Sequence, residues 1–367
     1  MRLALKLSIP LALAVAVPTT GVSAEDICNV RNVPRVVAVG DVHGAYDNFV
    51  SVLQMTGIVD DQVRWAGGKA HFVQTGDLLD RGVDTRKVLD LMMRLEKEAK
   101  KAGGRVHALL GNHEVMNMLG DLRYVDPEEY EAFRTPNSEK LREKFFDRIV
   151  ERNRERAKVA GEEFDEAALR ANLEKEAPLG FVERTQMLSA DGEYGRWLRK
   201  RNAVARVNGV VFLHGGLSPE VAPLGCKKIN KTVRREITGD FAKTRQDPLA
   251  TLVAGENGPL WYRGLAQEDE TVFAPALEQI LLTMDARALV VGHTVTVTGR
   301  IQSRFGGRVV MIDAGLAPAY KGSRAALEIG LDGRMVAVYP DGREAIERRA
   351  AEAAGPASDE RVAAVGR

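Results

Sequence analysis

The chain has 367 residues, of which 45% are hydrophobic and 28% are charged, and its formal net charge is +1. This length allows one large or two modest domains with ample chain to bury a core. Because the charges balance, the composition gives no electrostatic reason to expect binding to nucleic acid or to an anionic surface. A soluble globular protein is therefore the starting expectation.

The N-terminal residues differ in composition from the rest of the chain. Arg2 and Lys6 form a basic start, Leu7–Pro18 is apolar, and small residues lead up to Ala24. This order is typical of a secretory signal peptide over residues 1–24. An uncleaved membrane anchor is disfavoured because the apolar run is short for a bilayer. We expect an exported mature protein, periplasmic if the source is a Gram-negative bacterium, with no membrane association after cleavage.

The chain contains two cysteines, Cys28 and Cys226. In an oxidising compartment they can pair and tie the mature N-terminus to a segment far along the chain, or they can remain two independent thiols. The sequence leaves both alternatives open. Neither cysteine lies at a metal-ligand spacing, so neither is a predicted ligand.

Five hydrophobic, strand-like segments end abruptly in glycine and in side chains that bind metals. In chain order they are Val36–Gly44, His71–Gly82, Val106–Glu114, Val210–Gly216 and Leu289–Thr294. Four of the six histidines lie at the ends of these segments, namely His43, His113, His214 and His293. Imidazole nitrogens together with carboxylates suit a divalent transition metal. Glycine-rich strand ends let side chains from distant segments converge, so the pattern predicts a metalloenzyme.

Amphipathic helices are predicted between these segments. Apolar residues at helical spacing predict helices over Tyr46–Met55 and Thr85–Ala102, and the third segment opens into a helix at Val115–Leu119. Farther along the chain, Val233–Lys243 and Pro275–Met284 are predicted helices that precede the last segment.

Residues 120–200 have a different character. Charge density rises, strand signals vanish, and Ser138–Ala160 and Glu162–Ala177 have the composition of surface helices. The simplest interpretation is a set of solvated helix faces. Because this insertion separates the third segment from the fourth, we also predict that it overhangs the site as a lid and shapes substrate choice.

Strand signals return in the last third of the chain. The predicted strands are Ala203–Val207 and Val210–Leu213 around the turn Asn208-Gly209, then Val309–Ile312, and then Ala325–Leu331 and Met335–Val338 around Asp332-Gly333. Strands on both sides of the site with helices outside predict an α/β (α+β) fold, in which two mixed β-sheets pack face to face and are flanked by helices. Residues 25–345 form the predicted catalytic domain, and 346–367 form a tail.

The side chains at the strand ends can be divided between two metal ions. The first would be bound by Asp41, His43 and Asp77, and the second by Asp77, Asn112, His214 and His293, so that Asp77 bridges. Two metals about 3.5–4 Å apart share a water, lower its pKa and supply hydroxide for in-line attack. They also bind the oxygens of a tetrahedral anion, which favours phosphoryl chemistry over peptide or glycoside chemistry.

Further residues of the same segments fit a phosphatase site. Arg81 lies in the second segment, and a guanidinium group can bind phosphate oxygens bidentately. His113 is placed to protonate a leaving alkoxide or phenoxide as a general acid. Asp80 can orient His113 and hold its proton. Glu114 is expected to hydrogen-bond backbone near the third turn and has no predicted catalytic role.

The sequences GDVHG, GDLLDRG, GNHE, HGG and GHT, in this order, resemble the phosphoprotein phosphatase (PPP) branch of the calcineurin-like metallophosphoesterases. The exported form more narrowly resembles the bacterial Shewanella-like protein phosphatases. The resemblance covers roughly Val36 to Gly315 and leaves out the signal peptide, the insertion and the tail. It implies a metallophosphoesterase-like four-layer sandwich and two divalent metal ions, which are Mn, Fe or Zn.

The resemblance also implies roles for individual residues. The family's metal ligands fall on Asp41, His43, Asp77, Asn112, His214 and His293, its phosphate-binding arginine on Arg81, and its acid histidine on His113 paired with Asp80. The family has a later substrate-binding arginine, for which Arg263 in GPLWYRG is the candidate, although the local sequence departs from the eukaryotic pattern.

Several neighbouring residues have more than one interpretation. Trp261 and Tyr262 belong either to the core or to the wall of the active site. Asp313 follows a predicted strand, and it either supports a metal-binding histidine or caps the strand end. His71 and His107 start or lie within strands and are interpreted as structural.

The leading prediction is a dinuclear-metal phosphomonoesterase that dephosphorylates proteins at Ser/Thr or Tyr. We expect a monomer whose partner is a phosphorylated protein or a small phosphate ester. The alternative is a hydrolase of dinucleoside polyphosphates or other small phosphate esters, which the same motifs would serve. A nuclease-like phosphodiesterase is disfavoured because no basic stripe is evident. A non-catalytic metal-binding module is disfavoured because Arg81, His113 and every ligand position carry competent residues.

Overall fold

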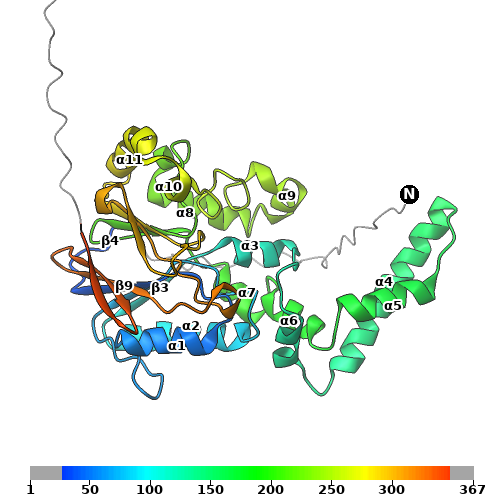
Figure 1. Ribbon diagram of the computed structural model, residues 1–367. Coiled ribbons are helices and arrows are strands. Elements are labelled where there is room, and N and C mark those ends of the chain that lie inside the picture. The colour runs from blue at the N-terminus through cyan, green and yellow to red at the C-terminus, as the bar shows by residue number, and fades with distance from the viewer. Residues whose placement is uncertain (1–26, 348–367) are drawn as a thin grey trace, which may run out of the picture.

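The computed structural model describes residues 27–347 (Figure 1). The predicted signal peptide and residues 348–367 of the predicted tail lie outside the described residues. Two mixed β-sheets form the centre of the molecule, and helices cover their outer faces (Figure 1). The predicted architecture is therefore confirmed. None of the helices between residues 27 and 347 has the length and hydrophobicity needed to cross a bilayer.

The first sheet has six strands in the order β11-β10-β9-β1-β2-β3. Their bounds are β1 Arg35–Val39, β2 His71–Gln74, β3 Arg105–Ala108, β9 Ala326–Gly330, β10 Met335–Tyr339 and β11 Gly342–Ile346. Strands β1, β2 and β3 are parallel, and β9, β10 and β11 add antiparallel pairs. Strand β11 was not predicted, and it places Ile346 in the sheet rather than in the tail.

The second sheet has five strands in the order β4-β5-β6-β8-β7. Their bounds are β4 Val204–Val207, β5 Val210–Leu213, β6 Ala288–Val291, β7 Gln302–Arg304 and β8 Val309–Met311. Strands β5, β6 and β8 are parallel, and β4 and β7 form antiparallel edges. The β4–β5 hairpin is as predicted. Strand β7 was missed because its three residues are polar and largely exposed.

Helices flank both sheets. They are α1 Tyr46–Met55, α2 Thr85–Lys101, α3 Asn112–Leu119, α8 Gly225–Glu236, α9 Phe241–Gln246, α10 Gly264–Gln267 and α11 Glu270–Thr283. Short 3-10 helices occur at Ala222–Leu224, Pro248–Ala250, Phe305–Gly307 and Pro318–Tyr320. In the view of Figure 1, α1 and α2 lie below the sheets, whereas α8, α10 and α11 lie above them.

One helix prediction is wrong in extent. The predicted helix Val233–Lys243 is split, because α8 ends at Glu236 and α9 begins at Phe241. Gly239 lies in the break, where its low helix propensity favours an interruption. The other boundaries differ less, since α3 begins at Asn112 and α11 at Glu270, each earlier than predicted.

The apolar core lies between the sheets and beneath each helical layer. Val36 and Ala38 of β1 pack in one cluster with Phe212 of the second sheet. Val37 and Val39 belong instead to the cluster beneath α1 and α2. This alternation follows from the two-residue period of a strand, and burial of both faces explains why the strands are continuously apolar.

The insertion divides into a base and an arm. The base consists of the 3-10 helix η1 (Pro127–Phe133), α6 (Phe181–Leu188) and α7 (Glu193–Leu198), and the arm consists of α4 (Ser138–Ala160) and α5 (Glu166–Glu176). Phe133 and Leu198 of the base belong to the same core cluster as Leu89 of α2. Phe146 and Leu173 of the arm pack in a second small core together with Tyr130 and Phe181 of the base. It projects away from the sheets (Figure 1).

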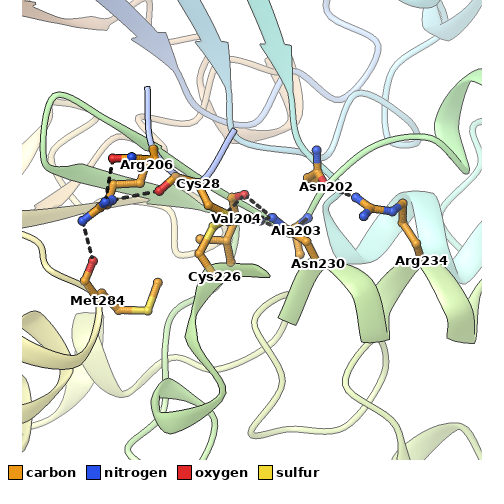
Figure 2. The surroundings of a disulfide bond; sticks show 10 residues. Cys28, Asn202, Ala203, Val204, Arg206, Cys226, Asn230, Arg234 and Met284 are labelled. Atoms are coloured by element: carbon orange, nitrogen blue, oxygen red, sulfur yellow. Dashed lines mark hydrogen bonds between the residues drawn. A yellow bond between two sulfur atoms is a disulfide. The ribbon is translucent and has the colours of Figure 1, made fainter. Parts of the chain in front are cut away.

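Cys28 and Cys226 form a disulfide bond, which decides between the two alternatives that the sequence left open (Figure 2). The bond links the N-terminal segment to α8 across a sequence separation of 198. Backbone hydrogen bonds support the same segment, since Val30 donates to the carbonyl of Arg206 in β4. Asn230 of α8 accepts hydrogen bonds from the backbone of β4 beside the disulfide (Figure 2). The disulfide thus reinforces an edge of the second sheet.

Candidate metal centre

Six predicted ligands meet where the parallel strands of both sheets end. Asp41 and His43 follow β1, Asp77 follows β2, Asn112 opens α3 after β3, His214 follows β5, and His293 follows β6. All six side chains are buried. Parallel strands end at a common edge of each sheet, and this arrangement brings residues separated by more than 200 positions together.

Asp77 lies at the centre of the cluster. Its Oδ2 atom is 3.2 Å from His214 Nε2, 3.7 Å from His43 Nε2 and 3.9 Å from His113 Nε2. Two sets of residues could each hold a metal ion, namely His43–Asp77–His113 and Asp77–His214–His293. Within each set, all the potential ligand atoms lie within 4.8 Å of one another. Asp77 belongs to both sets, which is the geometry that a bridging carboxylate requires.

The imidazole groups are oriented by backbone carbonyls. His43 Nδ1 donates to the carbonyl of Leu79 at 2.9 Å, and His214 Nδ1 donates to that of Thr75 at 3.1 Å. Both rings therefore direct Nε2 at the cluster, as metal-binding histidines do. His293 Nε2 is buried and has no hydrogen-bond partner between residues 27 and 347. A coordinated cation would satisfy this nitrogen, so the residues fit a metal centre.

The charge states of the cluster also suit cation binding. Burial lowers the pKa of His43 to about 4 and that of His293 to about 2, so both rings are neutral at physiological pH. Although burial acts in the opposite direction, the His214 and His113 imidazoles hold the pKa of Asp77 well below its usual range. Burial and the neighbouring carboxylates raise the pKa of Asp41. An ionised Asp77 beside the neutral imidazoles of His43 and His293 is a suitable donor set for a divalent cation.

The backbone at the strand ends is held in unusual conformations. His43, Asp77, Asp80, Arg81 and His293 have positive φ angles of 49°, 58°, 68°, 65° and 64°. Such conformations are uncommon for residues other than glycine and cluster at functional sites. The glycines of the motifs are needed for close packing, because a Cβ at Gly111 would overlap Asp77 Oδ1 and one at Gly292 would lie 2.5 Å from Asp41 Oδ1.

His113 and Asp80 form the predicted pair. His113 Nδ1 lies 2.6 Å from Asp80 Oδ2, and Asn117 Nδ2 donates to Asp80 Oδ1 at 2.9 Å. Although burial lowers it, the carboxylates of Asp77 and Asp80 raise the pKa of His113 overall. The protonated ring can donate a proton through Nε2. Hydrogen bonding to Asp80 fixes the ring, which is what a general acid requires.

The Arg81 guanidinium lies near two tyrosine rings and beside His113. Its guanidinium carbon is 4.6 Å from the ring centre of Tyr124 and 5.1 Å from that of Tyr320. Arg81 Nη2 is 3.4 Å from His113 Nε2, and the Arg81 backbone N–H donates to the carbonyl of Tyr124 at 2.8 Å. A phosphate at this point would meet a positioned cation and the proton donor together.

The remaining candidates are placed as follows. Arg263 Nη1 donates to the carbonyl of His293 at 3.1 Å, so the structure brings it to the second set of ligands. The Trp261 ring packs edge-to-face against that of His293 at 5.9 Å and also contacts the core, so both interpretations of Trp261 hold. Asp313 accepts from the backbone N–H of Gly315, as a strand-end cap would.

Two other interpretations are confirmed by contacts. The Glu114 carboxylate accepts from the backbone N–H groups of Asp77, Leu78 and Gly111, and it thereby joins the second and third turns. His107 Nε2 lies 3.0 Å from His71 Nδ1 on the neighbouring strand, outside both sets of ligand atoms.

Sequence reasoning missed the residues that surround Asp80 and Arg81. They are Asn117, Tyr124, Glu129, Arg184 and Tyr320, and all contact Asp80, Arg81 or each other. Asn117 lies four positions after His113 on α3, so helical spacing would have indicated it. The others carry no local signal.

Comparison with known proteins places the chain in a family. A profile of the calcineurin-like phosphoesterases matches residues 34–297. The chain belongs to this family. It is 35% identical over 317 residues to an uncharacterized protein of Schizosaccharomyces pombe, and the alignment covers 83% of this chain and 81% of the relative. It is 32% identical over 287 residues to Shewanella-like protein phosphatase 2 of Arabidopsis thaliana, and this alignment covers 77% of this chain and 71% of the relative.

A solved structure agrees with these relatives. The cold-active protein-tyrosine phosphatase of a psychrophilic Shewanella species superimposes with a TM-score of 0.65 at 29% identity, covering 88% of this chain and 84% of that chain. The family, the phosphatase relatives and the cluster of ligands together show a metal-dependent phosphatase of the calcineurin-like type. The predicted family, fold class and enzyme class are thus confirmed.

Proposed function

We propose that the protein is a phosphomonoesterase that uses two divalent cations and removes phosphate from tyrosine side chains of proteins. Asp41, His43 and Asp77 would hold one cation, which is Mn, Fe or Zn, and Asp77, Asn112, His214 and His293 would hold the other. Bound there, the cations would activate water and neutralise charge on the phosphate. The presence of Asp77 in both sets of ligand atoms supports its role as the ligand that the two cations share.

The protein's own residues perform the remaining steps. Arg81 binds two phosphate oxygens and orients the ester, since a planar guanidinium matches their spacing. His113 donates the proton from Nε2 to the leaving oxygen, and Asp80 keeps the ring in the orientation that this transfer needs. Arg263 borders the second set of ligands and contributes a second positive charge.

The observation that carries the substrate class is the contact of the Arg81 guanidinium with the rings of both Tyr124 and Tyr320. Tyr124 remains 39% exposed, and its ring lies 5.1 Å from that of His113. A phosphorylated phenol bound to Arg81 would have aromatic surfaces beside its ring, whereas phosphoserine has no ring to contact them. The protein-tyrosine phosphatase named among the structural relatives supports the same choice.

The same proposal includes the compartment and the partner. The signal-peptide pattern of residues 1–24 supports export, and the pairing of Cys28 with Cys226 is typical of an oxidising compartment. The substrate would then be a phosphorylated protein, which an exported monomeric enzyme meets outside the cytoplasm.

The test is a hydrolysis panel on the metal-reconstituted mature chain. Phosphotyrosine, phosphoserine and phosphothreonine peptides of one sequence are compared with a dinucleoside tetraphosphate and bis(p-nitrophenyl) phosphate. We expect the highest kcat/KM for the phosphotyrosine peptide. A higher kcat/KM for the dinucleoside tetraphosphate would replace this proposal with the small-ester alternative.

A pair of variants tests the aromatic argument directly. Tyr124→Leu should lower the phosphotyrosine-to-phosphoserine ratio of kcat/KM about two- to tenfold, which corresponds to the ~0.5–1.5 kcal/mol of an aromatic pair. Tyr46→Leu, at a half-buried tyrosine on α1 whose ring lies beside Lys87, is the matched control and should leave the ratio unchanged. An unchanged ratio in Tyr124→Leu would show that the ring does not contact the substrate.

A further inference from the structure

Arg184 is a fully buried cation that the insertion places behind the acid histidine. It is 1% exposed, and the two carboxylates beside it, Glu129 and Asp80, are not exposed at all. Arg184 Nε donates to Glu129 Oε1 at 2.5 Å, and Arg184 Nη2 lies 3.7 Å from Asp80 Oδ1. That Nη2 atom has no hydrogen-bond partner in the part of the chain that the structure describes. Burying an arginine costs free energy of desolvation, which only interactions with nearby negative charges can offset.

The contacts of Asp80 account for both of its oxygens. Oδ2 accepts from His113 Nδ1, and Oδ1 accepts from Asn117 Nδ2 and faces the Arg184 guanidinium. Asn117 lies on the same helix as His113, and its side chain also donates to the carbonyl of His113. Arg184 is the contributor from a separate part of the fold, and it supplies a full positive charge.

Glu129 ties Arg184 to the catalytic domain. Its other oxygen accepts from Thr85 Oγ1 at 2.9 Å, at the start of α2. Glu129 lies on η1 and Arg184 on α6, and the rings of Tyr130 and Phe181 pack at 5.7 Å beside them. The base of the insertion therefore positions the Arg184 guanidinium beside Asp80 and attaches it to α2 through Glu129.

We propose that Arg184 is a positioning residue for the Asp80–His113 pair, so that the base of the insertion is part of the proton-transfer machinery. This inference rests on the proposed role of His113 as general acid. In a buried setting, the attraction between Arg184 and Asp80 is much stronger than it would be in water. It holds Asp80 in the orientation that keeps Nδ1 of His113 occupied and Nε2 directed at the leaving oxygen.

The test measures kcat across aryl phosphates whose leaving groups run from phenol to 2,4-dinitrophenol. Poor leaving groups need the proton, and good ones do not. Arg184→Gln should lower kcat for phenyl phosphate about tenfold, part of the ~10²–10⁴-fold that a general acid contributes, and change 2,4-dinitrophenyl phosphate less than about twofold. Arg184→Lys should recover part of the loss because it keeps the charge. Metal content by elemental analysis should match wild type in both variants.

Two further variants separate positioning from folding. Arg184→Gln leaves Glu129 buried beside Asp80 without a cation, whereas the double variant Glu129→Gln/Arg184→Gln removes the buried charges together and should regain thermal stability. The double variant should keep the altered dependence on the leaving group. Arg170→Gln is the matched control, because this arginine of α5 pairs with Asp147 and Glu166 at the surface of the arm. It should match wild type throughout.

Outcomes for this inference and for the proposed function can be told apart. A folded double variant with the wild-type leaving-group dependence, or an equal fall in kcat for every leaving group, would overturn the positioning role of Arg184. His113→Asn is measured in parallel. If His113→Asn itself leaves the dependence unchanged, the proposed general acid is wrong, whatever the result for Arg184.

Discussion

The strand ends and the insertion both reach the catalytic residues, but they do so in different ways. The strand ends place Asp41, His43 and Asp77 directly in the cluster, through short turns that are specific to each motif. The insertion contributes no predicted ligand. It places Tyr124 against Arg81, and Arg184 near Asp80.

This difference predicts a hierarchy of effects. Loss of the strand-end residues should abolish chemistry, because both sets of ligand atoms consist of these residues. Loss of contacts from the insertion's base should weaken individual steps. The arm, which projects away from the sheets, should matter least (Figure 1).

Removal of the metals should have the largest effect. Exhaustive chelation should reduce hydrolysis of p-nitrophenyl phosphate to background, and added Mn²⁺, Fe²⁺ or Zn²⁺ should restore it. Asp77→Asn should lower the metal content that elemental analysis detects, because the carboxylate is shared by both sets of ligand atoms. Full activity in protein shown to be free of metal would contradict the two-cation proposal.

His113→Asn should lower turnover about 10²–10⁴-fold for poor leaving groups. The metal content should stay near wild type, because Nδ1 is engaged by Asp80 and the residue is proposed to donate a proton rather than bind metal. The geometry makes this a sharp test, since His113 also belongs to one set of potential ligand atoms. Loss of both metals in the variant would identify His113 as a ligand.

The same contrast explains what the sequence could predict. The predicted ligands were recognisable because each lies in a short motif with its own glycine, and the packing of Gly111 against Asp77 shows why that glycine is there. The pairing of Asp80 with His113, although 33 positions apart, followed from the chemistry that a general acid needs. The two-sheet architecture followed from buried strands that alternate with helices.

The contributions of the insertion could not be predicted in this way. Arg184 lies in a charge-rich stretch whose arginines look alike in sequence, and only tertiary packing distinguishes it from the partly exposed Arg170. Tyr124 in a turn and Tyr320 at the end of a short 3-10 helix become neighbours of Arg81 through local geometry that has no periodic signal. A local sequence pattern can identify a residue whose position is set by its own motif, such as Asp77. A residue that contacts such a motif only through tertiary packing, such as Arg184, can be identified only from the complete fold.

Arg81→Ala should weaken binding of inorganic phosphate and phosphate monoesters. A charge-assisted hydrogen bond contributes about 1.5–3 kcal/mol, so we expect a roughly ten- to hundredfold rise in the inhibition constant of phosphate. Hydrolysis of a phosphodiester should change little, because a diester presents fewer anionic oxygens. Equal losses on monoester and diester would mean that Arg81 shapes the loop with Tyr124 rather than binding the phosphate.

The disulfide should affect stability rather than turnover. Reduction, or the Cys28→Ser/Cys226→Ser variant, should lower the free energy of unfolding by about 2–4 kcal/mol, because the bond closes a very long loop. Below the unfolding transition, kcat should be unchanged, since the bond supports the edge of the second sheet beside α8 (Figure 2). Denaturant titration with and without reductant measures the difference. A change in kcat at full folding would indicate that this edge is coupled to the ligands.

Excision of the tip of the arm should have the smallest effect. Arg154 of α4 pairs with Glu166 of α5 at 2.6 Å, so residues 155–165 can be replaced by a short Gly/Ser linker that joins neighbouring positions. The small core that Phe146 and Leu173 of the arm share with the base is retained. Turnover of p-nitrophenyl phosphate should match wild type, because the arm projects away from the sheets (Figure 1).

The same variant tests the lid that the sequence predicted. Because the arm points away from the sheets, we expect the ratio of phosphopeptide to p-nitrophenyl phosphate hydrolysis to stay unchanged as well (Figure 1). Circular dichroism and elemental analysis would establish that the variant is folded and metal-loaded. A folded, loaded variant whose ratio shifts by more than about tenfold, or 1.4 kcal/mol, would show that the tip contacts the protein substrate. The arm would then rank with the base of the insertion, and the order of effects argued above would have to be revised.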